Sequence, residues 1–459
     1  MGFFSKKEIK QEVQPVVTDT EQGKLATTEG SAPAQRKCMQ MLTRIFAEGQ
    51  DATVMKIYIE NFKRLNELFG YDYCEDLLNQ ILEFLEKELQ VPIYHYIGVE
   101  FVAILHNRTI GEISRKAEKL EERFERGWKI RDTDCVCSIQ MGLCSCPGYP
   151  ENVTELLKYL DTAVYKAAEL GANQCVVYDS KLHNQYVRRQ TITRYLNTAL
   201  ENNEIEVRYH PTYNIKENKF TRAEFYMRIF VKGVGMVGAG EFLPIAEDSG
   251  QIRSVEYYAL DKVAAMIARL LDMGKEFDSI SLPVSPVLLL QEDFVEEVER
   301  VLKQYEIPAE KLALEIDEYA MSMAYIKTQD VMAQFADLGV ELVLAHFGSG
   351  YSGLSQIFEL PIQTVKFDRM FTWQLETSPN AEPIIEGLCQ IVHKVGRKLI
   401  AEGVETQKQL DALGRFECEM QQGFYYSPTL TEDVLVQVIS TDMKESREII
   451  EEAREEMKS

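Results

Sequence analysis

The feature that most constrains this chain is the regular alternation of β-like and helical segments through its second half. Segments with β-like composition recur with helical spacing between them, at residues 205–215, 220–230, 279–285, 311–317, 341–347, 364–368, 398–404 and 421–426. Eight strands that alternate with helices over this length predict a (β/α)8 barrel of the TIM type. The barrel is expected to occupy residues 197–435, followed by a charged helix at 436–459.

The first half of the chain has a different order of elements. Residues 36–180 contain strands and helices in the order strand, helix, paired strands, helix, strand, helix, strand. A mixed sheet with helices packed on it, the ferredoxin-like α+β class, is the simplest architecture for that order. Residues 1–35 are polar and lack apolar periodicity, so we expect a disordered tail. Residues 181–196 contain neither Gly nor Pro and have helical spacing, which predicts a linker helix.

Composition excludes several classes of function. The 459 residues carry a formal net charge of −23, which argues against nucleic acid as a partner and against anionic lipid. No apolar run is long enough to span a membrane, and the N-terminus has no signal-peptide core, so we expect no membrane insertion and a cytoplasmic location. Nine cysteines are an odd number for a disulfide framework, and we expect them to be reduced.

Two C-x-C pairs could in principle gather a thiolate metal site. They are Cys135 with Cys137 and Cys144 with Cys146. The alternative is that these residues share one face of a strand and pack as small hydrophobes, and we favour it.

Barrels of this class keep their chemistry at the carboxyl ends of the strands, because the loops there surround one opening. Polar residues inside apolar strands are costly to bury unless they are paired or bind a ligand, so converging carboxylates with one Lys suggest a metal or phosphate site. The residues at these ends are Glu224, Glu315, Asp317, Glu318, His346, Lys366, Asp368, Glu402, Glu405 and Gln422.

These residues also carry a resemblance to known families. The stretch RAEFYMR resembles the name-giving motif of bacterial EAL domains, which hydrolyse cyclic di-GMP, and LEIDE, HFGSGYSGL, VKFDRMF, AEGVET and QGFYYS follow in the same order. Upstream, NFKRLNELFGYDYCEDLL, YIGVEFVAIL and LDTAVYKAAELGANQCVVYD resemble the GGDEF domain, the diguanylate cyclase module. The folded chain is therefore similar to a GGDEF–EAL tandem.

The first module departs from the GGDEF pattern at its metal and signature positions. Tyr58 stands where the resemblance implies the first metal-binding Asp, and a neutral phenol is a poor Mg²⁺ ligand. Val99 replaces a carboxylate of the signature loop, which leaves Glu100 alone. We therefore expect no cyclase activity.

The barrel keeps part of the EAL pattern and loses part. The resemblance implies that Glu224 and Glu315 are remnants of metal ligands, that Lys366, Glu402 and Gln422 are remnants of the catalytic group, and that Arg228 contacts a ligand phosphate. The lost ligand positions are Pro283, Ala345 and His346. His346 could coordinate a softer ion such as Zn²⁺, but with two Glu it would make a single-metal site at best.

We therefore expect a catalytically degenerate GGDEF–EAL protein that acts as a cyclic di-GMP receptor or regulatory scaffold, with Arg228, Glu224, Glu315, Lys366 and Glu402 as ligand-binding residues. No cofactor is expected, and Mg²⁺ or Mn²⁺ would be needed only for residual phosphodiesterase activity. Two alternatives stay open: a phosphodiesterase with residual or altered-metal activity, and a protein-interaction scaffold that binds no nucleotide. The resemblance also implies a homodimer, or another protein partner.

Overall fold

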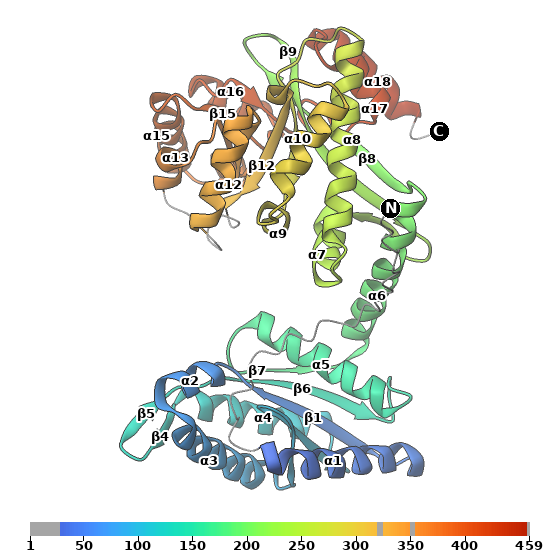
Figure 1. Ribbon diagram of the computed structural model, residues 1–459, viewed down its shortest axis with the longest axis vertical. Coiled ribbons are helices and arrows are strands. Elements are labelled where there is room, and N and C mark those ends of the chain that lie inside the picture. Colours follow the sequence, from blue (N-terminus) through green and yellow to red (C-terminus); the bar gives the residue numbers. More distant parts are fainter. Residues whose placement is uncertain (1–27, 319–324, 349–353, 457–459) are drawn as a thin grey trace, which may run out of the picture. The chain divides into compact units, whose positions relative to one another are not determined.

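The computed structural model describes residues 28–318, 325–348 and 354–456, which form two compact units that divide between Val187 and Arg188 (Figure 1). The expected tail at 1–35 lies largely outside the described residues. Helix α1 (Thr28–Glu48) begins inside that segment, so the last residues of the expected tail are helical.

The first unit is a mixed five-stranded sheet with helices on both faces, in the strand order β2-β3-β1-β6-β7. Most pairs are antiparallel, and β6 and β7 are parallel. This arrangement confirms the ferredoxin-like α+β class. Its elements are β1 (Ala52–Ile59), α2 (Phe62–Phe69), α3 (Tyr71–Leu89), β2 (Ile93–Ile97), β3 (Glu100–His106), α4 (Ile110–Glu125), β4 (Trp128–Ile130), β5 (Thr133–Cys135), β6 (Ile139–Cys146), α5 (Val153–Leu170) and β7 (Gln174–Val177).

Two apolar cores lie on the two faces of this sheet. Helices α2, α3 and α4 contribute to one core, and helices α1 and α5 contribute to the other. Cys135 and Cys137 belong to the first core, whereas Cys144 and Cys146 belong to the second. The expectation that these cysteines share one face of a single strand was wrong, because β5 ends at Cys135 and β6 begins at Ile139. All four thiols are buried as small hydrophobes, and the sheet separates the two pairs.

The second unit confirms the predicted barrel. Strands β8 (Ile205–Asn214), β9 (Lys219–Val231), β11 (Ser279–Val284), β12 (Leu312–Asp317), β13 (Glu341–Phe347), β14 (Thr364–Phe367), β15 (Lys398–Ala401) and β16 (Met420–Gln421) pair in sequence, and β8 closes the ring by pairing with both β9 and β16. Strand β10 (Gly235–Gly238) pairs antiparallel with the last residues of β9. Figure 1 shows the helices α8, α10 and α12 on the outside of the strands.

The helices and the short 3-10 turn of this unit are α7 (Ala239–Asp248), α8 (Ile252–Asp272), α9 (Pro286–Leu289), α10 (Phe294–Gln304), η1 (Ala309–Lys311), α12 (Tyr325–Leu338), α13 (Ser355–Glu359), α14 (Arg369–Thr377), α15 (Ala381–Lys394), α16 (Gln407–Arg415), α17 (Glu432–Val438) and α18 (Met443–Glu456). Helix α18 lies within the region 436–459 that was expected to be a C-terminal charged helix, and α17 ends at the start of that region.

Strict alternation fails at the first strand of the barrel. Strands β8 and β9 form an antiparallel hairpin, and no helix separates them. The connection is a short polar turn in which the Asn214 side chain accepts hydrogen bonds from the backbone of Lys216 and Glu217, and Asn218 takes a positive φ. Because β8 runs against the other strands, its first residues lie at the end of the barrel where the parallel strands finish.

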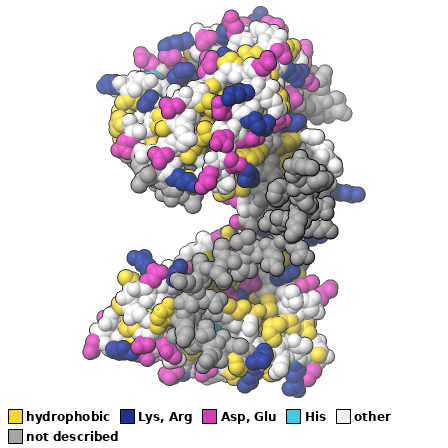
Figure 2. All heavy atoms as spheres, viewed as in Figure 1, with side chains coloured by type: hydrophobic (Ala, Val, Ile, Leu, Met, Phe, Trp, Pro, Cys, Tyr) yellow, Lys and Arg dark blue, Asp and Glu magenta, His cyan; other side chains and the backbone are white. Residues whose placement is uncertain are grey.

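Helix α6 (Ser180–Glu201) runs through the segment that was expected to be a linker helix. Within the second unit its Arg188 pairs with Glu241 of α7, and Arg189 pairs with Asp248. None of the helices that the structure describes is long and apolar enough to cross a membrane. On the face in view in Figure 2, acidic and basic side chains are interspersed, and the basic ones do not gather into one patch.

Candidate functional site

An ionic cluster from three strands occupies the centre of the barrel. Glu224 of β9, Glu315 of β12 and Lys366 of β14 point inward, because alternate residues of a strand face opposite sides. The ammonium of Lys366 donates to Glu224, and its Nζ lies 3.1 Å from Oε2 of Glu315. Ser281 of β11 donates from Oγ to Oε1 of Glu315 at 2.6 Å. The structure thus brings three of the predicted residues into direct contact.

Burial and mutual attraction set the charge of this cluster. The side chain of Lys366 is only 2% exposed, and burial alone would lower its pKa. The carboxylates of Glu224, Glu315 and Glu402 outweigh burial and raise the pKa of Lys366 well above its usual range. Burial raises the pKa of Glu315, and the nearby charge of Glu224 raises it further. Lys366 therefore stays charged and is the counterion of two carboxylates.

The neighbouring positions do not complete a site for two divalent cations. Pro283 lies beside Glu315 in the strand register, and Ala345 lies beside Asp317, so neither position offers a side-chain oxygen. Mg²⁺ requires near-octahedral oxygen ligands. Among the residues that the structure describes, no group of three or more His, Cys, Asp or Glu is arranged to hold a metal ion. This donor set does not fit a pair of Mg²⁺ ions.

His346 adopts an unusual backbone conformation at the end of β13. Its φ is 51°, in the left-handed region, and its side chain is about half exposed. Nδ1 lies 3.4 Å from Oδ2 of Asp368 and 3.9 Å from Oε2 of Glu402. The imidazole therefore lies next to the carboxylates of Asp368 and Glu402, at the ends of the next two strands. This pair of one Asp and one Glu differs from the two Glu that were considered as partners of His346 in a single-metal site.

Glu402 and Gln422 lie where β15 and β16 end. Oε2 of Glu402 is buried and accepts no hydrogen bond from the described residues. Gln422 donates from Nε2 to the carbonyl of His210 at 3.1 Å, and its Oε1 is likewise buried without a partner among them. These two oxygens can accept hydrogen bonds from a ligand or from water.

The loops that carry these two residues are held tightly together. The N–H of Val404 donates to the carbonyl of Gln422, and the next residue, Gly423, packs against the Val404 backbone. A Cβ on Gly423 would lie 2.2 Å from the Val404 carbonyl oxygen, so only glycine allows this approach.

His210 of β8 lies beside Glu224 in the strand register. Burial and the charge of Lys366 lower the pKa of His210 to about 4, so its ring is neutral near pH 7. Its Nε2 lies 3.1 Å from the carbonyl of Ser427. His210 therefore lies beside the central cluster as a neutral side chain with a fixed position.

Arg228, the predicted phosphate contact, is engaged by a residue that the sequence analysis missed. Glu206 of β8 lies opposite Arg228 in the register and accepts hydrogen bonds from its Nε at 2.6 Å and its Nη2 at 2.7 Å. The two residues are 22 positions apart, and the pairing became visible only when β8 proved to be antiparallel to β9.

Several other strand-end residues have structural partners. Glu318 is buried and accepts a hydrogen bond from the N–H of Gly348 at 3.0 Å. Asp368 caps α14 by accepting from the N–H of Met370. Glu405 is exposed, and its N–H donates to the side chain of Gln409 in the first turn of α16.

A second ionic layer lies below the central cluster, at the amino ends of the parallel strands. Arg222 donates from Nη1 to both carboxylate oxygens of Glu341 at 2.8 Å, and Ser279 and Thr364 donate to the same carboxylate. Arg222 and Thr364 each precede a central residue by two positions, so strand periodicity could have identified them as inward-facing.

The altered positions of the first unit lie together at the ends of β1 and β3. Tyr58 is the register partner of Glu100, and the N–H of Ile59 donates to the carbonyl of Val99. Glu100 is paired with the buried Lys56 of β1, whose Nζ lies 2.8 Å from its Oε2. Lys56 also binds Asp161 of α5. The surviving carboxylate of the signature loop therefore has a lysine as its counterion.

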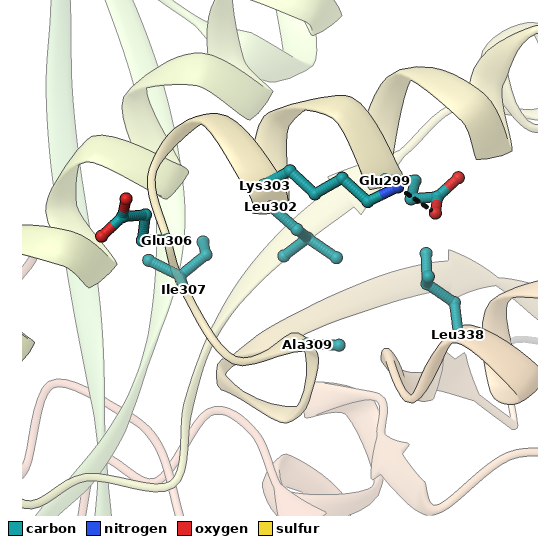
Figure 3. Close-up of a pocket in the computed structure, with 7 residues that line it drawn as sticks. All are labelled: Glu299, Leu302, Lys303, Glu306, Ile307, Ala309 and Leu338. Carbon is teal, nitrogen blue, oxygen red and sulfur yellow. Dashed lines mark hydrogen bonds and ion pairs between the residues drawn. The ribbon is translucent and has the colours of Figure 1, made fainter.

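One surface hollow, of about 310 Å³, lies away from all of these residues. Figure 3 shows it between α10, η1 and the end of α12, with a floor of Leu302, Ile307, Ala309 and Leu338 and with the Lys303–Glu299 pair at its edge. None of the predicted site residues lines it, so it is separate from the candidate site.

Comparison with protein families matches both halves of the chain. The EAL domain family matches residues 193–429, and the family described as diguanylate cyclase, GGDEF domain, matches residues 34–174.

Two curated bacterial proteins illustrate the relatives. The chain is 27% identical over 420 residues to the signaling protein YkoW of Bacillus subtilis, across 89% of this chain and 52% of YkoW. It is 25% identical over 402 residues to the bifunctional diguanylate cyclase/cyclic di-GMP phosphodiesterase MucR of Pseudomonas aeruginosa, across 87% of this chain and 59% of MucR. The chain thus spans about half the length of the curated relatives it matches.

Solved structures resemble the barrel alone and both units. The PaMucR phosphodiesterase in complex with c-di-GMP is 26% identical, with a TM-score of 0.51, and covers 53% of this chain and 99% of its own. The S helix-GGDEF-EAL portion of Vibrio cholerae LapD, bound to c-di-GMP, is 21% identical with a TM-score of 0.54, and covers 85% of this chain and 93% of its own. At that identity LapD supports the fold alone.

Proposed function

The chain belongs to the EAL family as a tandem GGDEF–EAL protein of cyclic di-GMP signalling, and from this premise we propose that it acts by binding and not by catalysis. In this proposal the chain is a cyclic di-GMP receptor or regulatory scaffold whose two catalytic sites have degenerated. The barrel is the unit that we propose to bind the nucleotide.

One observation carries the proposal. The Lys366 ammonium lies between Glu224 and Glu315, so the two retained carboxylates already have a counterion. Pro283 and Ala345 add no oxygen beside them. A hydrolase of this family would use two cations to activate water, and too few donors are present here to hold them.

Binding does not require those cations. Cyclic di-GMP carries two phosphodiester charges, and a guanidinium recognises a phosphate oxygen by charge-assisted hydrogen bonds. Arg228 supplies such a group at the barrel mouth, and the buried oxygens of Glu402 and Gln422 can accept hydrogen bonds from the ligand. The similarity to the PaMucR phosphodiesterase, whose structure is a c-di-GMP complex, supports the same ligand for this barrel.

Calorimetric titration of the purified chain with cyclic di-GMP tests the proposal, with EDTA and with Mg²⁺ or Mn²⁺, followed by chromatography of the nucleotide. We expect binding of similar affinity in every buffer and no linear product. Metal-dependent linearisation would instead support the altered-metal phosphodiesterase. Absence of binding would support the protein-interaction scaffold. In that case the carboxylates around Lys366 and Lys56 would serve only to neutralise these buried lysines.

Two further features belong to the same proposal. We infer a homodimer or another protein partner, because a receptor without catalysis must pass occupancy to a second surface. The nine free cysteines, eight of them buried, fit a reducing compartment such as the cytoplasm.

A further inference from the structure

Glu206 connects two arginines at the mouth of the barrel. Its carboxylate accepts from Nε and Nη2 of Arg228 at 2.6 and 2.7 Å, which is the two-point geometry of a guanidinium–carboxylate pair. Arg208 donates to Oε1 of the same carboxylate, from Nε at 2.8 Å and from Nη2 at 2.7 Å. Glu206 therefore holds one edge of the Arg228 guanidinium and directs the other edge away from β8.

The opposite flank of Arg228 is open. Gly238 of β10 is the register partner of Arg228 on that side, and it contributes no side chain. A Cβ built on Gly238 would meet no heavy atom within 4 Å. The Arg228 side chain is itself about one-third exposed. A ligand oxygen can therefore reach the guanidinium from the side that Glu206 leaves free.

Glu206 is ionised where it meets the two arginines. The hydrogen bond from Arg228 lowers the pKa of Glu206, and Arg208 lowers it further, so the carboxylate stays ionised near neutral pH. The ionised carboxylate fixes the orientation of the Arg228 guanidinium, whose free edge can still donate to a phosphate oxygen.

We propose that Glu206 is a positioning residue, which holds the Arg228 guanidinium so that its free edge receives a phosphate of the bound dinucleotide. This inference rests on the proposed function, because it names how the same site holds the ligand. Glu206 itself does not touch the ligand, and it acts only through Arg228.

A double-mutant cycle tests this dependence. Glu206→Gln, Arg228→Met and the double variant are titrated with cyclic di-GMP at about 1 M salt, where the screening length is about 3 Å and the lost negative charge no longer attracts the ligand from a distance. We expect Glu206→Gln to weaken binding about tenfold in the wild-type background, as for one charge-assisted hydrogen bond. In the Arg228→Met background, Glu206→Gln should change the dissociation constant less than about twofold.

Glu217→Gln is the matched control, because Glu217 lies in the turn at the other end of the same hairpin, where it pairs with Lys219. It should bind like the wild type. An equal loss in both backgrounds would indicate a structural role and overturn the inference, as would unchanged or tighter binding by Glu206→Gln. If the wild type itself does not bind, the proposed function fails and this inference fails with it.

Discussion

Pro283 lies directly beside Glu315 in the parallel register of β11 and β12. The strand position next to a retained carboxylate therefore carries a ring that can neither bind a cation nor donate a backbone hydrogen bond. On the far side of Glu315, Val343 of β13 is the register partner, and Ala345 follows it on the same face. Pro283 and Ala345, on the two strands that flank β12, thus offer no side-chain oxygen.

Restoring these donors should restore metal dependence. We expect the triple variant Pro283→Asn, Ala345→Asp and His346→Asp to linearise cyclic di-GMP with Mn²⁺ at least about 100-fold faster than the wild type, because two cations would stabilise the phosphoryl charge by several kcal/mol. Chromatography of the product measures the rate. Val287→Asn, an exposed substitution in the neighbouring helix α9, is the control and should not change it. Equal rates for the triple variant and the wild type would contradict this account.

Lys366 should be essential for the stability of the barrel. Lys366→Met leaves the buried carboxylates of Glu224 and Glu315 without a counterion, and we expect a loss of about 3–5 kcal/mol in the free energy of unfolding at pH 8. The loss should shrink at lower pH, because burial and the charge of Glu224 raise the pKa of Glu315 and favour its protonated form. Urea unfolding followed by Trp373 fluorescence, in a Trp128→Phe background, measures it.

The control for this experiment is a surface pair of the same type. Lys303 and Glu299 are four residues apart on α10 and exposed, so Lys303→Met should cost less than about 1 kcal/mol. If the Lys366→Met and Lys303→Met variants are equally stable at pH 8, the Lys366 ammonium does not stabilise the central cluster.

The fold was largely predictable because its signals are local. Each barrel strand from β11 onward is a short apolar run between helical segments, and this pattern identified the barrel without any knowledge of the pairing. The orientation of β8 was not predictable in this way. The sequence from Asn214 to Asn218 indicates a turn, but it does not show with which strand β8 pairs. The break between Cys135 and Ile139 was missed, because a continuous apolar pattern can contain an irregular connection.

The candidate site was only partly predictable, because its signals are long-range. Glu224, Glu315 and Lys366 were identified as charges inside apolar strands. The partnership of Arg222 with Glu341 spans 119 positions, and nothing in the local sequence pairs them. Such pairs follow from the order of the strands around the barrel.

The first unit should not make cyclic di-GMP. Glu100 is held by Lys56, and Tyr58 beside it offers a phenol in place of a carboxylate, so metal-bound GTP lacks its ligands. Incubation with GTP and Mg²⁺ should yield no cyclic di-GMP by mass spectrometry. Tyr58→Phe removes the remaining oxygen at this position and should give the same result. Formation of the product by the wild type would contradict the assignment.

Glu256 should make the stability of the barrel depend on pH. This buried carboxylate of α8 accepts from both N–H and Oγ of Ser285, the residue that caps α9 at the end of β11. Burial raises the pKa of Glu256 to about 7, and the Ser285 hydrogen bonds only partly oppose it. Between about pH 4.5 and 7 the folded state therefore holds a proton that the unfolded state has lost. The stability from this group is complete below that window and is lost as the pH rises through 7.

Glu256→Gln removes this titration while it keeps the size of the side chain and one acceptor for Ser285. Relative to the wild type, the variant should gain about 3 kcal/mol between pH 4.5 and 8, from 1.4 kcal/mol per pH unit across the window. Urea unfolding followed by Trp373 fluorescence at several pH values measures the difference. Glu276→Gln, at an exposed position just before β11, is the control for the loss of one carboxylate. If the Glu256→Gln difference changes with pH no more than the Glu276→Gln difference does, burial does not control the proton of Glu256.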